Sequence, residues 1–176
     1  TGTNQTGTMY NEGETISSTT TLYATSGDPS GNCYDEEQFQ VTILDQPDID
    51  PIMDVTECGY YVLPTISGTN LTGNEAYYDQ MNGNGNSWQE GDTLFSSMTL
   101  YAYDDNGSCS DEESFSVTID PAPDIDPIMD VTACMSYTLP SISGTNLTGN
   151  QAYYTGPDQS GTMYSPGDNI TSTTTL

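Results

Sequence analysis

Residues 48–78 read DIDPIMDVTECGYYVLPTISGTNLTGNEAYY, and residues 124–154 repeat this stretch almost unchanged as DIDPIMDVTACMSYTLPSISGTNLTGNQAYY. Without gaps, 25 of the 31 positions agree at an offset of 124 − 48 = 76 residues. Self-similarity at a fixed period indicates a tandem array of structural units. A unit of 76 residues exceeds a solenoid coil of about 20–45 residues and has the size of a small β-sandwich.

The repeat divides the chain into three parts. We expect residues 1–46 to be the C-terminal part of one repeat, residues 47–122 to be a complete repeat, and residues 123–176 to be the N-terminal part of the next. The boundaries fall at Gln46-Pro47 and at Pro121–Pro123, where proline stiffens a short extended connection. The sequence therefore predicts one whole domain between two partial ones.

Alternation of apolar and polar residues decides the secondary structure. In the complete repeat it predicts strands near residues 60–66, 75–78, 87–89, 92–95, 98–103 and 114–119. Asn106-Gly107 supplies the positive φ angles of a tight hairpin and should join the last two strands. No segment shows a 3.6-residue apolar period. We therefore expect an all-β fold of tandem Ig-like β-sandwich repeats of about 76 residues, each with a disulfide and joined by short Pro/Asp linkers.

The charge composition excludes several classes of function. The chain has no Lys, Arg or His, and its 26 Asp and Glu give a formal net charge of −26. Nucleic acids and anionic lipid surfaces are excluded as partners because their phosphates require cations. No nucleophile–base pair can be assembled without His or Lys, so we expect no enzyme. No window of 18 apolar residues exists, so no membrane insertion is expected in this stretch.

Two cysteines occur in each 76-residue period, because Cys33 aligns with Cys109 and Cys58 with Cys134. Regularly spaced cysteines in a small polar domain are typical of disulfides and of an oxidising compartment. Zinc is disfavoured because the chain has no CxxC pair and no His. We expect an internal Cys58–Cys109 bridge, with Cys33 and Cys134 pairing outside this stretch. The alternative pairs Cys33 with Cys58 and Cys109 with Cys134.

Longer phrases resemble a known family. LPTISGTNLTGNEAYY from Leu63, its copy from Leu139 and CSDEESFSVTI from Cys109 are similar to the tandem Ig-like repeats of giant cell-surface proteins of gliding Bacteroidota, of the gliding-motility adhesin type. The resemblance covers the whole chain. It implies secretion, display on the cell surface, and a role in adhesion or gliding.

Near-identical repeats add length rather than new chemistry, so the sequence and the resemblance together indicate a structural stalk of a large secreted adhesin or filament. Its partners would be the neighbouring repeats of the same chain. Two alternatives are open: repeats that bind a ligand such as a surface glycan or ice through Thr- and Tyr-bearing strands, and a fibre subunit that associates with other copies through exposed strand edges.

Acidic residues cluster around the two linkers and after the second cysteine of the repeat. Calcium prefers six to eight oxygen ligands in carboxylate-rich loops, so an ion at each linker is one hypothesis. The other interpretation is that these acids are solvated surface. The candidate ligands are Asp48, Asp50, Asp54, Asp111, Glu112, Asp124, Asp126 and Asp130.

One modification site follows from the resemblance. Asp92-Thr93-Leu94 is similar to the three-residue O-glycosylation signal of the same bacterial group. This likeness makes Thr93 a candidate for a sugar attached through its hydroxyl.

Overall fold

A computed structural model of the chain describes residues 1–31 and 33–175, and within them every regular element is a β-strand. The strands are β1 (Thr20–Gly27), β2 (Tyr34–Val41), β3 (Asp48–Ile49), β4 (Val55–Cys58), β5 (Tyr61–Val62), β6 (Gly68–Thr69), β7 (Ala76–Gln80), β8 (Asn84–Trp88), β9 (Thr93–Leu94), β10 (Met98–Asp105), β11 (Ser110–Asp120), β12 (Asp124–Ile125), β13 (Tyr137–Thr138), β14 (Gly144–Thr145), β15 (Tyr153–Gly156), β16 (Ser160–Tyr164) and β17 (Asn169–Ile170). The lack of a 3.6-residue apolar period predicts an all-β chain, and the described residues confirm this prediction.

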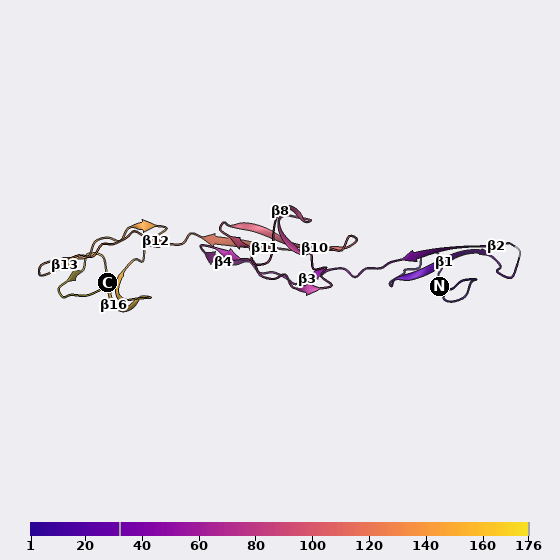
Figure 1. Ribbon diagram of the computed structural model, residues 1–176, viewed down its shortest axis with the longest axis horizontal. Coiled ribbons are helices and arrows are strands. Elements are labelled where there is room, and N and C mark those ends of the chain that lie inside the picture. The colour runs from indigo at the N-terminus through magenta and orange to yellow at the C-terminus, as the bar shows by residue number, and fades with distance from the viewer. Residues whose placement is uncertain (32, 176) are drawn as a thin grey trace. The chain divides into compact units, whose positions relative to one another are not determined.

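The chain divides into two compact units. The first comprises Thr1–Val55, Val62–Thr93 and Met98–Val117. The second comprises Thr56–Tyr61, Leu94–Ser97 and Thr118–Leu176. The largest sheet has the strand order β4-β11-β10-β7-β8 and belongs to the complete repeat (Figure 1).

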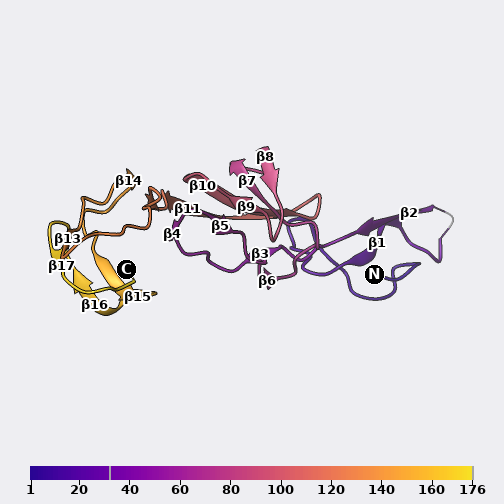
Figure 2. The ribbon, with the colours of Figure 1, turned by 60° about the vertical axis from the view of Figure 1, so that its left-hand side comes forward.

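The predicted hairpin is the centre of this sheet. β10 and β11 pair antiparallel from Met98↔Val117 to Asp105↔Ser110, and the chain turns through Gly107 with φ 87°. The predicted hairpin is therefore confirmed, with a positive φ at Gly107 but not at Asn106. β7 joins the other edge of β10 and continues into β8 by a further antiparallel pairing, as Figure 2 shows for the pink strands.

Alternate residues of these strands form the core of the complete repeat. Leu100 and Ala102 of β10 are fully buried, as is Tyr77 of β7, and Phe115 and Val117 of β11 are nearly so. The rings of Tyr77 and Phe115 meet edge to face with centroids 5.8 Å apart, a preferred aromatic geometry. The buried Tyr77 hydroxyl donates to the Pro64 carbonyl oxygen at 3.0 Å, so burial of the ring leaves no unpaired hydroxyl.

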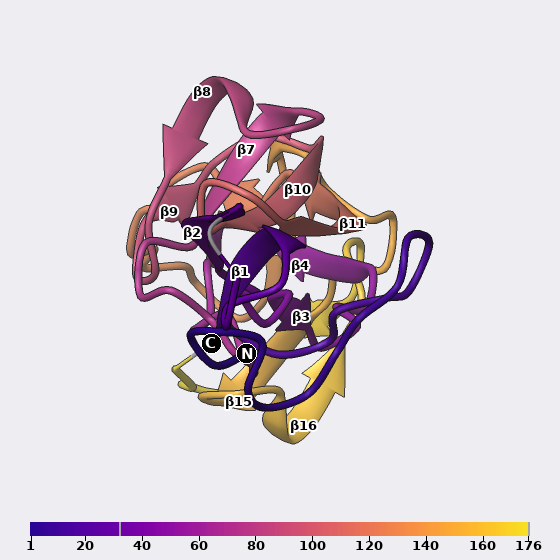
Figure 3. The ribbon, with the colours of Figure 1, turned by 90° about the vertical axis from the view of Figure 1, so that its right-hand side faces the viewer.

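Short strand pairs account for the remaining strands. In the complete repeat β3 pairs with β6 and β5 with β9, and the same pairings recur after residue 123 as β12–β14 and β13–β17. β1 pairs with β2 along eight residues each, and β15 with β16 (yellow in Figure 3). In the part of the chain that is described there are thus one five-stranded and six two-stranded sheets.

The predicted Ig-like β-sandwich class is therefore wrong, because small scattered sheets replace the regular pair of sheets expected for each repeat. The physical reason is visible at the strand predicted over 60–66, of which only Tyr61–Val62 is regular. Pro64 lies two residues after the end of β5 and cannot donate a ladder hydrogen bond. Leu63 instead exchanges backbone hydrogen bonds with the turn at Gly91-Asp92, at 2.9 Å each.

The predicted disulfide in each repeat is wrong as well. All four cysteines, which lie within the described residues, are unpaired; Cys33, Cys58 and Cys134 are exposed and Cys109 is partly buried. This finding overturns both the Cys58–Cys109 bridge and the alternative pairs.

The register of β4 explains why Cys58 does not reach Cys109. Just beyond β4, Gly59 donates its N–H to the Asp120 carbonyl, and just before it Asp54 accepts from the Ser116 N–H. β4 therefore runs in the same direction as β11, and Cys58 lies beside the end of β11 that is far from Cys109. About ten residues at ~3.3 Å each separate the two positions, whereas a disulfide requires Cα atoms within about 7 Å.

Candidate functional site

The best-defined polar cluster surrounds the first linker. We call it the linker clamp and define it as Asp45–Ile49 with the side chains of Asn70, Asn106 and Asp111. Asn106 donates from Nδ2 to the Asp45 carbonyl at 2.8 Å, and Asn70 donates from Nδ2 to the Gln46 carbonyl at 3.1 Å. Asp111 accepts from the Ile49 N–H at 2.7 Å. The linker backbone is thus bonded to three elements of the repeat that follows it.

Proline contributes to the same clamp by packing. Pro47 is one of the most buried residues of the complete repeat, although proline is usually exposed. It cannot donate a backbone hydrogen bond, so its burial leaves no N–H unsatisfied. The carbonyl of Gln46, the residue before Pro47, still needs a hydrogen-bond donor, and Asn70 provides it.

The second linker repeats part of this arrangement inside the second unit. Asn146, the equivalent of Asn70, donates from Nδ2 to the Ala122 carbonyl at 3.2 Å. Asp126 donates its N–H to the Ser143 carbonyl at 2.9 Å, just as Asp50 donates to Ser67 at 2.8 Å. The duplicated phrase therefore encodes a duplicated contact.

The two clamp asparagines also share an unusual backbone. Asn70 has φ 55° and Asn146 has φ 53°, in the left-handed region that asparagine tolerates better than most residues. Each stands in the same SGTNLTGN phrase. At both positions asparagine thus adopts the left-handed conformation of the turn and also donates a hydrogen bond to the linker carbonyl.

Three of the eight carboxylates proposed as calcium ligands accept hydrogen bonds from backbone N–H groups. Asp54 accepts from the Ser116 N–H at 2.7 Å, Asp111 accepts from Ile49, and Glu112 accepts from Asn82. Asp48 and Asp124 lie in the short strands β3 and β12, while Asp50, Asp126 and Asp130 are exposed.

Asp45, Asp48 and Asp111 line one hollow beside the linker, so the structure brings together only part of the predicted set. Among residues 1–31 and 33–175 no three Asp, Glu or Cys side chains are placed so that they could hold one metal ion. The calcium hypothesis therefore has no assembled ligand set in the described residues.

Thr93 lies in β9 with its side chain exposed, next to the buried Leu94. The glycosylation hypothesis requires an accessible hydroxyl, and the position meets that requirement. The modification itself stays a prediction.

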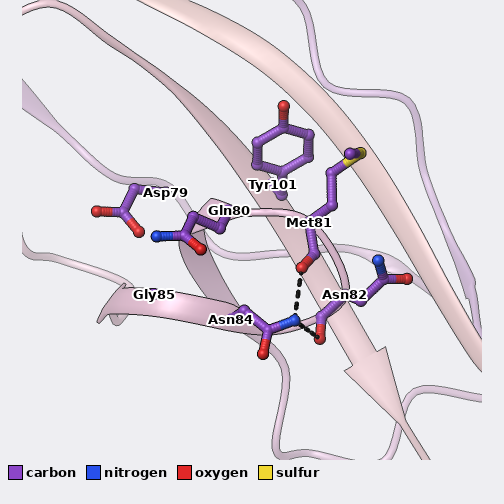
Figure 4. Close-up of a pocket in the computed structure, with 7 residues that line it drawn as sticks. All are labelled: Asp79, Gln80, Met81, Asn82, Asn84, Gly85 and Tyr101. Atoms are coloured by element: carbon purple, nitrogen blue, oxygen red, sulfur yellow. Dashed lines mark hydrogen bonds between the residues drawn. The ribbon is translucent and has the colours of Figure 1, made fainter.

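A second hollow, of about 600 Å³, lies at the β7–β8 turn and is lined by Asp79, Gln80, Met81, Asn82, Asn84, Gly85 and Tyr101 (Figure 4). Two of its polar side chains, Asp79 and Asn84, are bonded within the turn itself. Asn84 donates from Nδ2 to the carbonyls of Met81 and Asn82, and Asp79 accepts from the backbone and side-chain nitrogens of Asn86. Amides and one carboxylate that stabilise a turn form no acid–base pair for catalysis.

The sequence interpretation missed the central residues of the clamp. Asn70, Asn106 and Asn146 were recognised only as parts of turn or duplicated phrases, although each reaches a linker carbonyl. For Asn70 and Asn146 the available signal was an asparagine at the same place in both copies of the phrase SGTNLTGN, and for Asn106 it was the Asn-Gly turn alone.

Comparison with known proteins gives no assignment. No protein-family model matches the chain, and no curated protein matches it either. In the described residues no helix is present that is long and apolar enough to cross a membrane.

Proposed function

We propose that this chain is an extender: a structural stalk of tandem β repeats in a large secreted cell-surface adhesin or filament, which serves adhesion or gliding by its reach. The observation that carries the proposal is the repeated linker contact. Asn70 and Asn146 each hold the carbonyl of the residue that precedes the linker proline, at 3.1 and 3.2 Å. A connection made in the same way at successive linkers suits an element whose purpose is regular length.

The dimensions of the repeat support a spacer role. β11 alone contains 11 residues, which span about 35 Å at ~3.3 Å per residue. An array of many such units adds length in proportion to their number, and nearest-neighbour contacts suffice to hold it together.

The chemistry of the surface agrees with the same proposal. A chain with 26 acids and no basic side chain has only like charges, which repel neighbouring chains and keep the array soluble. The hollows at the linker and at the β7–β8 turn are lined by groups that hold turns rather than by a reactive pair.

The extracellular location rests on the resemblance alone. The redox argument has lost its support, because the cysteines of the described chain are unpaired. We retain the cell surface as the proposed location since the repeated phrases are similar to those of giant surface proteins of gliding Bacteroidota.

Labelling of intact cells tests the proposal. Antibodies raised against this chain, conjugated to gold, should decorate thin filaments on unpermeabilised cells that produce the protein. Label that appears only after permeabilisation would contradict the surface role. Pre-incubation of the antibodies with the purified chain is the control for specificity.

A second candidate, glycan binding, is favoured by one exposed aromatic pair. The rings of Tyr60 and Phe95 lie 6.4 Å apart at an interplanar angle of 49°, with exposed fractions of 57% and 74%. Exposed aromatic faces offer stacking surface to sugars. A glycan array should show binding that Phe95→Ala removes and that Met53→Ala, at an equally exposed position, leaves unchanged. An array without signal would dismiss this candidate.

A further inference from the structure

The segment that enters the complete repeat runs beside the segment that leaves it. Four hydrogen bonds join the two segments, and the partners of each are separated by 61 or 62 residues. A constant separation means that both segments advance in the same direction, so residues 45–59 lie parallel to residues 106–120. The four pairs are Asp45–Asn106, Ile49–Asp111, Asp54–Ser116 and Gly59–Asp120, at 2.8, 2.7, 2.7 and 2.8 Å.

β4 supplies the sheet pairing within this contact. It pairs with β11 in the five-stranded sheet, as Figure 2 shows, between the bond of Asp54 and the bond of Gly59. Parallel strands cannot be joined by a tight turn, and here the connection contains the other three strands of the sheet, β7, β8 and β10. The first and the last strand of this sheet are therefore direct neighbours.

The entering segment is also bonded to β6. β3 pairs antiparallel with β6, with Ile49 opposite Gly68, and the Asp50 N–H donates to the Ser67 carbonyl at 2.8 Å. A β-carbon on Gly68 would lie 2.2 Å from the Asp48 carbonyl oxygen, so only glycine permits this close approach. The entering segment is thus held by two different neighbours before it reaches β4.

A pull on the two ends of the repeat acts directly on the parallel contact. The chain enters at Pro47, next to the beginning of β11, and leaves at Pro121, directly after the end of β11. Stretching therefore draws residues 45–59 in one direction and β11 in the opposite direction. The hydrogen bonds between them lie across the force and must break together, whereas two strands pulled apart from the same end separate one bond at a time.

The strands β7, β8 and β10 lie outside this load path. None of them is connected directly to a linker. β10 is held to β11 by eight opposed pairs, from Met98↔Val117 to Asp105↔Ser110, whereas β4 offers only four residues to β11. The contact of β4 with β11 is therefore the one that yields first, and the rest of the sheet is loaded only afterwards.

We propose that each repeat bears mechanical load through the parallel contact between residues 45–59 and residues 106–120, which we call the shear contact. The inference rests on the proposed extender role, since a stalk transmits the pull between its two ends. Both sides of the contact recur along the chain: DIDPIMD of residues 48–54 returns at 124–130, and DEESFSVTI from Asp111 is the counterpart of DEEQFQVTI from Asp35. Successive repeats therefore encode the same resistance to stretching.

Optical tweezers test the proposal by pulling one fold in two directions. Cys33, Cys58 and Cys134 are exposed and unpaired, so each can carry a DNA handle. In Cys58→Ser/Cys109→Ser, handles on Cys33 and Cys134 pull through the two linkers and load the contact in shear. In Cys33→Ser/Cys109→Ser, handles on Cys58 and Cys134 pull from the end of β4 and from beyond the end of β11, which peels these strands apart.

The shear geometry should require at least a two-fold higher rupture force than the peeling geometry at the same loading rate, because forced unfolding is governed by the unfolding barrier. The length gained identifies the event. It should be about 23 nm in shear, from the 76 residues of the repeat at ~3.5 Å each less the folded length. Peeling should give about 21 nm, because residues 47–58 lie outside the pulled stretch. Equal rupture forces would overturn the proposal and leave the extender role untouched.

A substitution within the contact provides a second test. Asp54→Ala removes the acceptor of the Ser116 N–H and should lower the rupture force in shear. It should leave the peeling force unchanged, because peeling starts at the Gly59–Asp120 end. Asp50→Ala is the matched control: its side chain is exposed and its bond to Ser67 is made by the backbone, so both forces should stay as they are. An equal loss in both geometries for Asp54→Ala would contradict the proposal.

Discussion

At the scale of single residues, several carboxylates in this chain accept hydrogen bonds from backbone N–H and hydroxyl groups. Asp104 is the clearest example, with 1% of its surface exposed in the core of the complete repeat. It accepts from the backbone N–H of Thr72 at 2.8 Å and from the Thr72 hydroxyl, and the Asp105 N–H adds a third bond at 3.0 Å. Buried charge is tolerated when such hydrogen bonds replace water.

Asp104→Ala should destabilise the complete repeat by about 1–3 kcal/mol, since it leaves the half-buried Thr72 N–H without an acceptor. The only tryptophan of the chain is Trp88, which lies in β8 of that repeat. Urea unfolding followed by Trp88 fluorescence therefore measures the relevant transition. Asp50→Ala, at an exposed position, is the control and should leave the midpoint within error. A midpoint unaffected by Asp104→Ala would contradict the role of this carboxylate.

The cysteines give a second prediction at this scale. Because all four are unpaired within the described chain, a thiol reagent such as DTNB should titrate four thiols in native, unreduced protein. The exposed Cys33, Cys58 and Cys134 should react first, and the partly buried Cys109 last. Cys109→Ser should remove the slow phase alone. Fewer than four reactive thiols before reduction would show that a disulfide forms after all.

Tyr34 gives a prediction for alkaline pH. Burial, with a hydrogen bond and charge from Glu36, raises the pKa of Tyr34 from 10.0 to about 12. The phenol donates to Glu36 Oε2, so ionisation breaks this bond. Because the folded pKa is raised, the contribution of the bond to stability is complete below pH 10 and is lost as the pH rises toward 12. The absorbance titration of the 13 tyrosines at 295 nm should contain a step near pH 12 that Tyr34→Phe removes and Glu36→Gln moves to lower pH. Because burial raises the pKa of Tyr61 and of Tyr153 as well, the readout is the difference between the variant and the unaltered chain. An unchanged amplitude near pH 12 in Tyr34→Phe would refute the assignment.

At the scale of elements, the linker depends on one side chain in a left-handed turn. Asn70→Ala removes the bond to the Gln46 carbonyl and places a β-carbon at φ 55°. Each effect costs about 1 kcal/mol. Asn70→Gly keeps the backbone conformation and removes only the bond, so it should cost about half as much. Urea unfolding followed by Trp88 fluorescence measures the loss of unfolding free energy in both variants. An equal loss in Asn70→Ala and Asn70→Gly would show that the left-handed conformation does not contribute to the cost.

The length of a strand decides whether it can be predicted from this sequence. β10 and β11 were predicted because Leu100, Ala102, Phe115 and Val117 alternate with polar residues, and the structure confirms the hairpin. β3, β4 and β6 were not predicted. Each has two to four residues, too few for a period of two to be recognised, and each pairs with a segment far along the chain. The clamp was missed for the same reason, because the contact of Asn106 with Asp45 spans 61 residues.

At the scale of the whole molecule, 26 acids with no basic side chain make long-range electrostatics purely repulsive in the folded state. Partly buried hydrogen bonds to carboxylates, such as that of Asp111, act locally and are screened little by salt. The repulsion between exposed acids extends over about 10 Å at 0.1 M salt. The free energy of unfolding should therefore increase with ionic strength. Salt screens the repulsion between acids in both states, but this repulsion is larger in the compact folded state than in the expanded unfolded chain.

Thermal melts in NaCl, MgCl2 and CaCl2 test this balance and the calcium hypothesis together. The melting temperature should rise with NaCl, and Mg²⁺ and Ca²⁺ at equal concentration should give the same additional rise, since the linker carboxylates Asp54 and Asp111 are bonded to N–H groups and no set of three converges in the described chain. Mg²⁺ is the control because it screens like Ca²⁺ and requires stricter octahedral geometry. A rise specific to Ca²⁺ that EGTA reverses would instead establish an ion at the linkers, and Asp48→Asn and Asp124→Asn would then locate it at the first or the second.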